Sequence, residues 1–189
     1  MRITGGQAAR RILKVPKGFD VRPTPDLVKQ AVFNSLGARV VGARVLELFA
    51  GSGALSLDCL SRGATSALCV EKSHKHAEFI RGNAAAAGLI TLLEVWPRDV
   101  FAAIQDLAGN GRQFDLILAD PPYGEKNIGR RSTSFAQWLL DDPNLPKLLA
   151  AGGRFILGHA KRDTLEIVPP WREMKTLKHG DGLMRFLEI

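Results

Sequence analysis

The sequence predicts an α/β fold: a doubly wound, mostly parallel, seven-stranded Rossmann-like sheet that ends in an antiparallel hairpin. Three observations lead to this fold class. From residue 44 onward, short apolar runs typical of buried strands alternate with amphipathic helical segments. A glycine turn at residues 51–53 joins the first strand to the first helix. Acidic residues follow the later strands, at the carboxyl ends where such sheets bind their ligands.

The first part of the chain, residues 1–43, is expected to be a basic N-terminal arm followed by a helix, and residues 44–189 to be the main domain. Residues 1–19 mix apolar and basic side chains with Gly5-Gly6, which indicates a short hairpin or arm. The helix signals that follow are Thr24 as the N-cap, Pro25 at the first helical position and Gly37 as the stop.

The main domain then repeats strand and helix. Strands are expected at 44–49, 66–71, 90–96, 114–119 and 154–158. Helices are expected near 53–62, 74–87, 99–108 and over 134–150. The tail, residues 171–189, predicts two strands joined at His179–Gly182, because Asp-Gly is a strong hairpin signal.

The composition favours a cytoplasmic protein with a sizeable core. Of the 189 residues, 46% are hydrophobic, yet no apolar run approaches the ~20 residues that span a membrane. The N-terminus lacks the apolar stretch of a signal peptide. Cys59 and Cys69 are not spaced like metal ligands, so we expect two reduced core residues and no metal site.

Positive charge is concentrated at the N-terminus. Nine of the 26 Lys and Arg residues lie in residues 1–44, against only Asp20 and Asp26, so this segment carries the whole net charge of +7. Such a segment favours a polyanionic partner, with nucleic acid the first candidate. The alternative is an ordinary solvated basic surface.

The glycine turn predicts a binding site for a nucleotide-like cofactor, since strand, glycine turn and helix N-terminus let the backbone approach a ligand closely. Glu71, at the end of the second strand, suits vicinal ribose hydroxyls. Its spacing from Gly51 also fits a dinucleotide site. However, Ser56 stands where the dinucleotide fingerprint has its third glycine, which disfavours a nicotinamide enzyme.

Asp120-Pro121-Pro122-Tyr123 ends the fourth main-domain strand with a carboxylate, a rigid turn and an aromatic ring. The Asp120 carboxylate and the Pro121 carbonyl are suited to accept both hydrogens of an exocyclic amine, and Tyr123 to stack on the base that carries it. The alternative is an ordinary turn after a strand.

These residues resemble a known family. Leu46–Ala54 together with Asp120–Tyr123 is similar to S-adenosylmethionine-dependent amino-methyltransferases. Three further stretches resemble the bacterial 16S ribosomal RNA guanine-N2 methyltransferases of the RsmD type. They are Ile3–Gly6, Val21–Thr24 with Val32–Asn34, and Leu60–Ala64.

The resemblance implies a methyl transfer from S-adenosylmethionine to a guanine N2 amine by direct displacement at the sulfonium. It implies that Asp120, Pro121, Pro122 and Tyr123 hold the target base. The implied cofactor residues are Glu47, Phe49, Ala50, Gly51, Ser52, Gly53, Glu71, Lys72, Asp99, Val100 and Asp120, with Glu71 on the ribose and Asp99 on the adenine amine.

The expected partner is 16S ribosomal RNA within a small-subunit assembly intermediate, bound by a monomer with no membrane contact. The candidate RNA contacts are Arg2, Arg10, Arg11, Lys14, Arg22, Thr24, Arg130 and Arg131. The chain departs from the family pattern at Ala9–Leu13, where Arg-Gly-Arg-x-Leu is usual, and in a longer loop at Gly124–Ser134.

Two other functions stay open. Asp-Pro-Pro-Tyr also suits an adenine N6 amine, so a DNA or RNA adenine methyltransferase is the alternative enzyme. An RNA-binding module that keeps the fold without catalysis is the alternative of another class.

Overall fold

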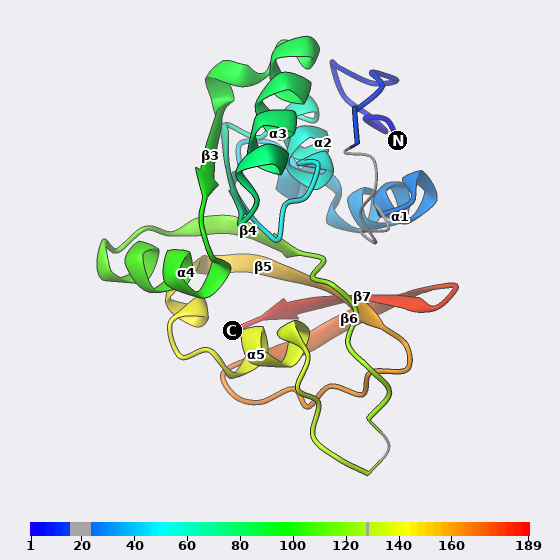
Figure 1. Ribbon diagram of the computed structural model, residues 1–189, viewed down its shortest axis with the longest axis vertical. Coiled ribbons are helices and arrows are strands. Elements are labelled where there is room, and N and C mark those ends of the chain that lie inside the picture. The colour runs from blue at the N-terminus through cyan, green and yellow to red at the C-terminus, as the bar shows by residue number, and fades with distance from the viewer. Residues whose placement is uncertain (16–23, 128) are drawn as a thin grey trace. The chain divides into compact units, whose positions relative to one another are not determined.

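The computed structural model describes residues 1–15, 24–127 and 129–189 (Figure 1). The chain divides into two compact units, Met1–Ala103 and Ile104–Ile189. Each unit contributes parallel strands with helices between them.

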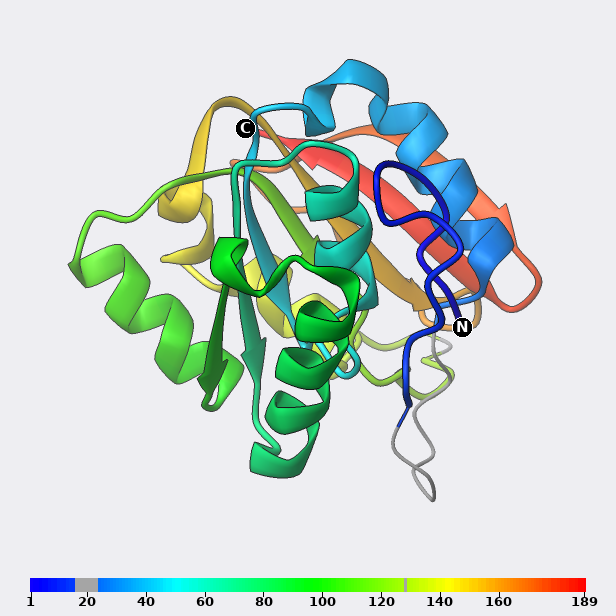
Figure 2. The same ribbon diagram turned by 90° about the horizontal axis from the view of Figure 1, so that it is seen from above.

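The first unit contains three parallel strands in the order β3-β2-β1. They are β1 (Arg44–Leu48), β2 (Ser66–Glu71) and β3 (Leu93–Pro97). The crossover helices α2 (Ala54–Ser61) and α3 (His74–Ala87) lie side by side against these strands (Figures 1 and 2). The third strand begins later than expected, because residues Ile90–Leu92 form the 3-10 turn η2.

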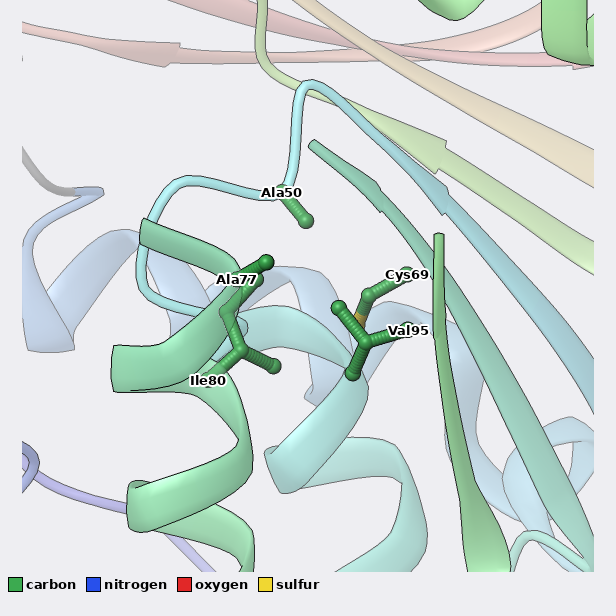
Figure 3. Close-up of a cluster of buried hydrophobic side chains, with 5 residues drawn as sticks. All are labelled: Ala50, Cys69, Ala77, Ile80 and Val95. Carbon is green, nitrogen blue, oxygen red and sulfur yellow. The ribbon is translucent and has the colours of Figure 1, made fainter. Parts of the chain in front are cut away.

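A cluster of buried apolar side chains holds α3 against this sheet. Ala77 and Ile80 of α3 point toward Cys69 of β2 and Val95 of β3, and Ala50 of the glycine turn closes the cluster (Figure 3). Both cysteines are free and buried, which confirms that they are core residues.

The N-terminal arm folds back on itself through a β-bridge between Arg2 and Ile12. Helix α1 (Asp26–Leu36) follows, and the short 3-10 helix η1 (Gly37–Val40) links it to the sheet. Gly37 ends α1 with a positive φ of 55°, as predicted. The N-cap prediction was wrong: Pro25 occupies the cap position with extended ψ, so the helix begins at Asp26 instead of Pro25.

The second unit contains four strands in the order β4-β5-β7-β6. They are β4 (Phe114–Ala119), β5 (Leu149–Ala160), β6 (Arg172–His179) and β7 (Gly182–Glu188). The β4–β5 pair is parallel, whereas β5–β7 and β6–β7 are antiparallel. With the three strands of the first unit, this gives the predicted mixed, mostly parallel seven-stranded sheet.

The helix expected over residues 134–150 is shorter than the sequence predicted. Helix α4 (Val100–Gly109) agrees with expectation, but α5 (Phe135–Asp141) ends just before Pro143, and η3 (Leu145–Leu148) is only a 3-10 turn. A proline removes a backbone donor and clashes with the preceding turn, which explains the early end. No helix among the described residues is long and apolar enough to span a membrane.

Candidate functional site

The glycine turn after β1 adopts a left-handed backbone at three positions. Phe49, Gly51 and Gly53 have φ values of 56°, 56° and 73°. This conformation is unfavourable for a side chain such as that of Phe49, and strain of this kind concentrates at ligand-binding sites. A Cβ at Gly53 would lie 2.8 Å from Cγ2 of Ile80, so α3 packs directly on the turn.

Glu71, at the end of β2, is bonded to this turn. Its Oε2 accepts a hydrogen bond from the Gly51 N–H at 2.8 Å, and its Oε1 accepts one from the Ser73 N–H at 2.9 Å. Nδ1 of His76 lies 3.6 Å from Oε1. The structure therefore brings together the predicted acidic residue and the predicted glycine turn, with the carboxylate fixed in orientation.

Asp99, another of the predicted acidic residues, immediately precedes helix α4. Its Oδ1 accepts a hydrogen bond from the Phe101 N–H at 3.0 Å, and its Oδ2 lies 3.5 Å from Nζ of Lys72. Asp99 keeps about half of its side chain exposed, with 47% accessible, whereas the neighbouring Val100 is buried. Asp99 thus caps the start of α4 while about half of its side chain stays accessible to solvent.

Glu47 is placed differently from the other carboxylates, because it is buried beneath the turn. Its two oxygens accept hydrogen bonds from the N–H groups of Ser56 at 2.8 Å and Leu55 at 3.4 Å, in the first turn of α2. The Cys69 thiol lies 3.5 Å away and donates to the same carboxylate. Burial raises the pKa of Glu47 to about 7. Its observed contacts anchor the start of α2.

Asp120 and Tyr123 rest against two glycines that the sequence analysis did not single out. A Cβ at Gly158 of β5 would overlap Oδ1 of Asp120, and a Cβ at Gly182 of β7 would lie 2.6 Å from the Tyr123 hydroxyl. Pro121, the residue after Asp120, is buried, whereas Tyr123 remains 46% exposed. These glycines leave room for the carboxylate and the ring at the carboxyl end of β4.

The N-terminal arm is docked on the C-terminal end of α2. The Ser61 hydroxyl donates to the Gly5 carbonyl at 2.6 Å and accepts from the Ala8 N–H at 2.9 Å. The Ser61 carbonyl accepts from the Gln7 N–H at 2.8 Å. A Cβ at Gly6, whose φ is 78°, would overlap that carbonyl. Two stretches that carry the family resemblance, the Gly-Gly arm and the end of α2, are therefore direct contact partners.

Lys29 corrects the charge argument made from the sequence. Lys29 is one of the nine Lys and Arg residues within residues 1–44, but its side chain is fully buried in α1. Its Nζ lies 3.0 Å from Oδ2 of Asp58, and Oδ1 of Asp58 accepts hydrogen bonds from the N–H and hydroxyl of Thr4 at 2.7 and 2.8 Å. Lys29 therefore connects α1 to Asp58 of α2, which in turn binds Thr4 of the arm. Its buried ammonium group is not accessible to an RNA phosphate.

The predicted RNA contacts differ in availability. Arg10, Arg11, Lys14 and Arg130 are exposed. Arg2 is also exposed but pairs with Asp26 at 3.1 Å, and Arg131 pairs with Asp141 at 2.6 Å and with Glu166. Thr24 is half-buried, and Arg22 lies outside the described residues.

Sequence comparison finds relatives whose names are those of ribosomal RNA methyltransferases. It is 38% identical over 124 residues to the ribosomal RNA small subunit methyltransferase D of Escherichia coli, which covers 65% of this chain and 60% of that protein. It is 35% identical over 128 residues to "Putative rRNA methyltransferase YlbH" of Bacillus subtilis, covering 68% and 70%. The aligned region is thus less than two thirds of the Escherichia coli protein.

Structural comparison covers the entire chain. A hypothetical protein of Thermus thermophilus superposes with a TM-score of 0.82 and 28% identity, over 100% of this chain and 99% of that one. A family model described as "Conserved hypothetical protein 95" matches residues 1–188. The chain therefore belongs to the conserved hypothetical protein 95 family, which is the RsmD family.

Proposed function

We propose that this chain is an S-adenosylmethionine-dependent methyltransferase that modifies the exocyclic N2 amine of a guanine in 16S ribosomal RNA. The observation that carries the proposal is the hydrogen bond between the Glu71 carboxylate and the Gly51 N–H. It supplies a fixed acceptor beside a glycine turn, in a chain of the RsmD family. The Escherichia coli relative is named a small-subunit ribosomal RNA methyltransferase, and the Bacillus subtilis relative a putative rRNA methyltransferase.

The residues of the first unit fit this cofactor. Each Glu71 oxygen accepts one backbone N–H and keeps capacity for a second bond, which suits the two hydroxyls of a ribose. The absence of side chains at Gly51 and Gly53 lets a ligand approach the backbone of the turn closely. The half-exposed carboxylate of Asp99, whose Oδ2 lies 3.5 Å from Nζ of Lys72, is proposed to accept a hydrogen bond from the adenine amine. Phe49, Ala50 and Ser52 belong to the same turn. Glu47 accepts hydrogen bonds from the first turn of α2, Lys72 lies 3.5 Å from Asp99, and Val100 is the buried residue that follows Asp99.

S-adenosylmethionine supplies a methyl group on a sulfonium that is already electrophilic, so the protein's task is to position and desolvate the amine. In our proposal, the Asp120 carboxylate and the Pro121 carbonyl accept the two amine hydrogens and aim the nitrogen lone pair. Pro122 keeps the turn rigid, and Tyr123 stacks on the base. No covalent nucleophile on the protein is required.

The basic arm is proposed to bind the RNA. Residues 1–43 form the RNA-binding extension and residues 44–189 the catalytic domain in this proposal. A guanine within folded RNA must be splayed out of its stack to reach a pocket, and phosphate contacts by Arg10, Arg11 and Lys14 suit that task. The substrate is then a small-subunit assembly intermediate, and the protein acts as a cytoplasmic monomer.

A transfer assay with labelled S-adenosylmethionine tests the proposal. Unmodified 16S ribosomal RNA and double-stranded DNA are offered in parallel, and only the RNA is expected to become labelled. Labelling of DNA would favour the adenine-N6 alternative, which Asp-Pro-Pro-Tyr also suits. Absence of S-adenosylmethionine binding in calorimetry would favour an RNA-binding module without catalysis.

A further inference from the structure

Asn83, a buried residue of α3, contacts both the N-terminal arm and the glycine turn. Its Oδ1 accepts a hydrogen bond from the Lys14 N–H at 2.8 Å, and its Nδ2 donates to the Lys14 carbonyl at 3.0 Å. The same Nδ2 donates to the Ser52 carbonyl at 3.2 Å. One side chain thus bonds two segments that are far apart in sequence.

These three bonds use both amide hydrogens of Asn83 and one acceptor position of its Oδ1. The carbonyl oxygen and one amide hydrogen pair with the backbone of Lys14, in the way that a neighbouring strand would. The second amide hydrogen is left for Ser52. Aspartate has the same shape but no donor, so it would place a charged oxygen against the carbonyls of Lys14 and Ser52. Because Asn83 is buried, water does not readily replace the lost bonds.

Helix α3 adds a second contact at the same place. Ile80, one turn before Asn83, packs against Gly53 so closely that a Cβ there would lie 2.8 Å from its Cγ2. Both ends of the Gly51–Gly53 turn are therefore held. Glu71 accepts the hydrogen bond of the Gly51 N–H, Asn83 of α3 donates one to the Ser52 carbonyl, and Ile80 of α3 packs against Gly53. Lys14 thus has an exposed side chain and a backbone that is hydrogen-bonded to Asn83 through both its N–H and its carbonyl.

We propose that Asn83 is a positioning residue that couples the RNA-binding arm to the cofactor-binding turn. The inference rests on the function proposed above. When RNA phosphates bind the arm, they fix the backbone of Lys14. Asn83 transmits this restraint to Ser52, so the glycine turn is already less mobile and loses less conformational entropy when the cofactor binds. Each ligand then strengthens the binding of the other by the same factor, as thermodynamic linkage requires.

The test measures the dissociation constant of S-adenosylhomocysteine for the full chain, with and without in vitro transcribed 16S ribosomal RNA. RNA is expected to tighten binding about fivefold in the wild type, the lower end of typical coupling. In Asn83→Asp and Asn83→Ala, the ratio of the dissociation constant without RNA to that with RNA is expected to fall to about one. Lys14→Ala keeps the backbone bonds to Asn83, so it should weaken RNA binding while the ratio at saturating RNA persists.

Asn110→Asp is the matched control, because Asn110 is exposed and its side chain donates to the carbonyl of Asp106, within its own helix region. Its ratio should equal that of the wild type. A wild-type ratio near one, or an unchanged ratio in both Asn83 variants, would overturn the coupling. Failure of the wild type to bind either ligand would instead overturn the proposed function.

A measurement on the wild type alone covers the case in which the Asn83 variants do not fold. Hydrogen exchange is followed at the Lys14 amide and over residues 50–55, with RNA added and no cofactor present. Slower exchange in both segments is expected. Protection at Lys14 with unchanged exchange at residues 50–55 would contradict the proposal.

Discussion

Oε2 of Glu71 lies 2.8 Å from the Gly51 nitrogen and accepts its hydrogen bond. The two residues belong to different strand ends, β2 and β1, which pair in parallel register. A glycine turn alone is weak evidence for a cofactor site, and so is a carboxylate at a strand end. Their hydrogen bond brings the two sequence signals together at one place, where we propose that the cofactor binds.

Replacing Glu71 by glutamine should weaken S-adenosylmethionine binding by about tenfold or more. The variant loses the charge and one acceptor oxygen, and hydrogen bonds to charged groups contribute roughly 1.5–3 kcal/mol. Isothermal calorimetry measures the change. Glu78→Gln is the control, because Glu78 is an exposed carboxylate of α3 that pairs with Arg81 on the same helix. Equal affinity in the two variants would remove Glu71 from the cofactor site.

Gly6→Ala should displace the N-terminal arm. Gly42→Ala is a matched comparison, since both glycines have a φ of 78°, but a Cβ at Gly42 meets nothing within 4 Å while one at Gly6 overlaps the Ser61 carbonyl. Both variants carry the left-handed backbone cost of roughly 1–2 kcal/mol. Only Gly6→Ala should also weaken RNA binding, measured by filter binding. Loss of RNA affinity in both variants would contradict a specific role for arm docking.

Lys29→Met should lower the free energy of unfolding by about 3 kcal/mol, because the buried Asp58 carboxylate loses the ammonium group 3.0 Å away and is left with the Arg62 guanidinium, whose Nε lies 3.7 Å from its Oδ1. Methionine preserves most of the side-chain volume. The exposed Lys178→Met should change stability by less than about 0.5 kcal/mol. Urea unfolding of both variants, and of Lys29→Met combined with Asp58→Asn, isolates the ion pair. If the double variant is no more stable than Lys29→Met alone, the buried negative charge of Asp58 is not the cause of the destabilisation.

Glu47 makes stability depend on pH. Its pKa is raised from 4.5 to about 7 in the folded chain, so between these values the folded state retains a proton that the unfolded state has released. Stability is therefore expected to be highest below the unfolded pKa and to fall as pH rises toward the folded pKa, by about 3 kcal/mol in total. Glu47→Gln should flatten this part of the profile, as measured by urea unfolding between about pH 5 and about pH 8. Parallel profiles for the wild type and the variant would contradict the assignment.

Local patterns in the sequence were sufficient to predict most of the fold. Strand β4 and helix α3 occupy the predicted residues, because continuous apolar runs and clear start and stop signals define them. Strand β5 extends well beyond the predicted 154–158, since its glycine-rich start at Gly152-Gly153 carries no apolar pattern. The early end of α5 reflects Pro143, a signal that the sequence does contain.

The burial of Lys29 and the bonds of Asn83 could not be predicted in the same way. A lysine on a helix is normally exposed, and the Asp58 carboxylate that neutralises this one is 29 residues away in sequence. Asn83 meets Lys14 across 69 residues. Such pairs depend on tertiary packing, which local periodicity does not encode.

We propose that the chain methylates a guanine N2 amine of 16S ribosomal RNA and that Asp120 positions this amine. The most direct test incubates unmodified 16S ribosomal RNA with S-adenosylmethionine and either the wild type or Asp120→Ala, then identifies the modified nucleosides by mass spectrometry. We expect N2-methylguanosine with the wild type and none with Asp120→Ala, which should still bind S-adenosylmethionine in calorimetry. N6-methyladenosine as the product, or undiminished N2-methylguanosine from Asp120→Ala, would contradict this proposal.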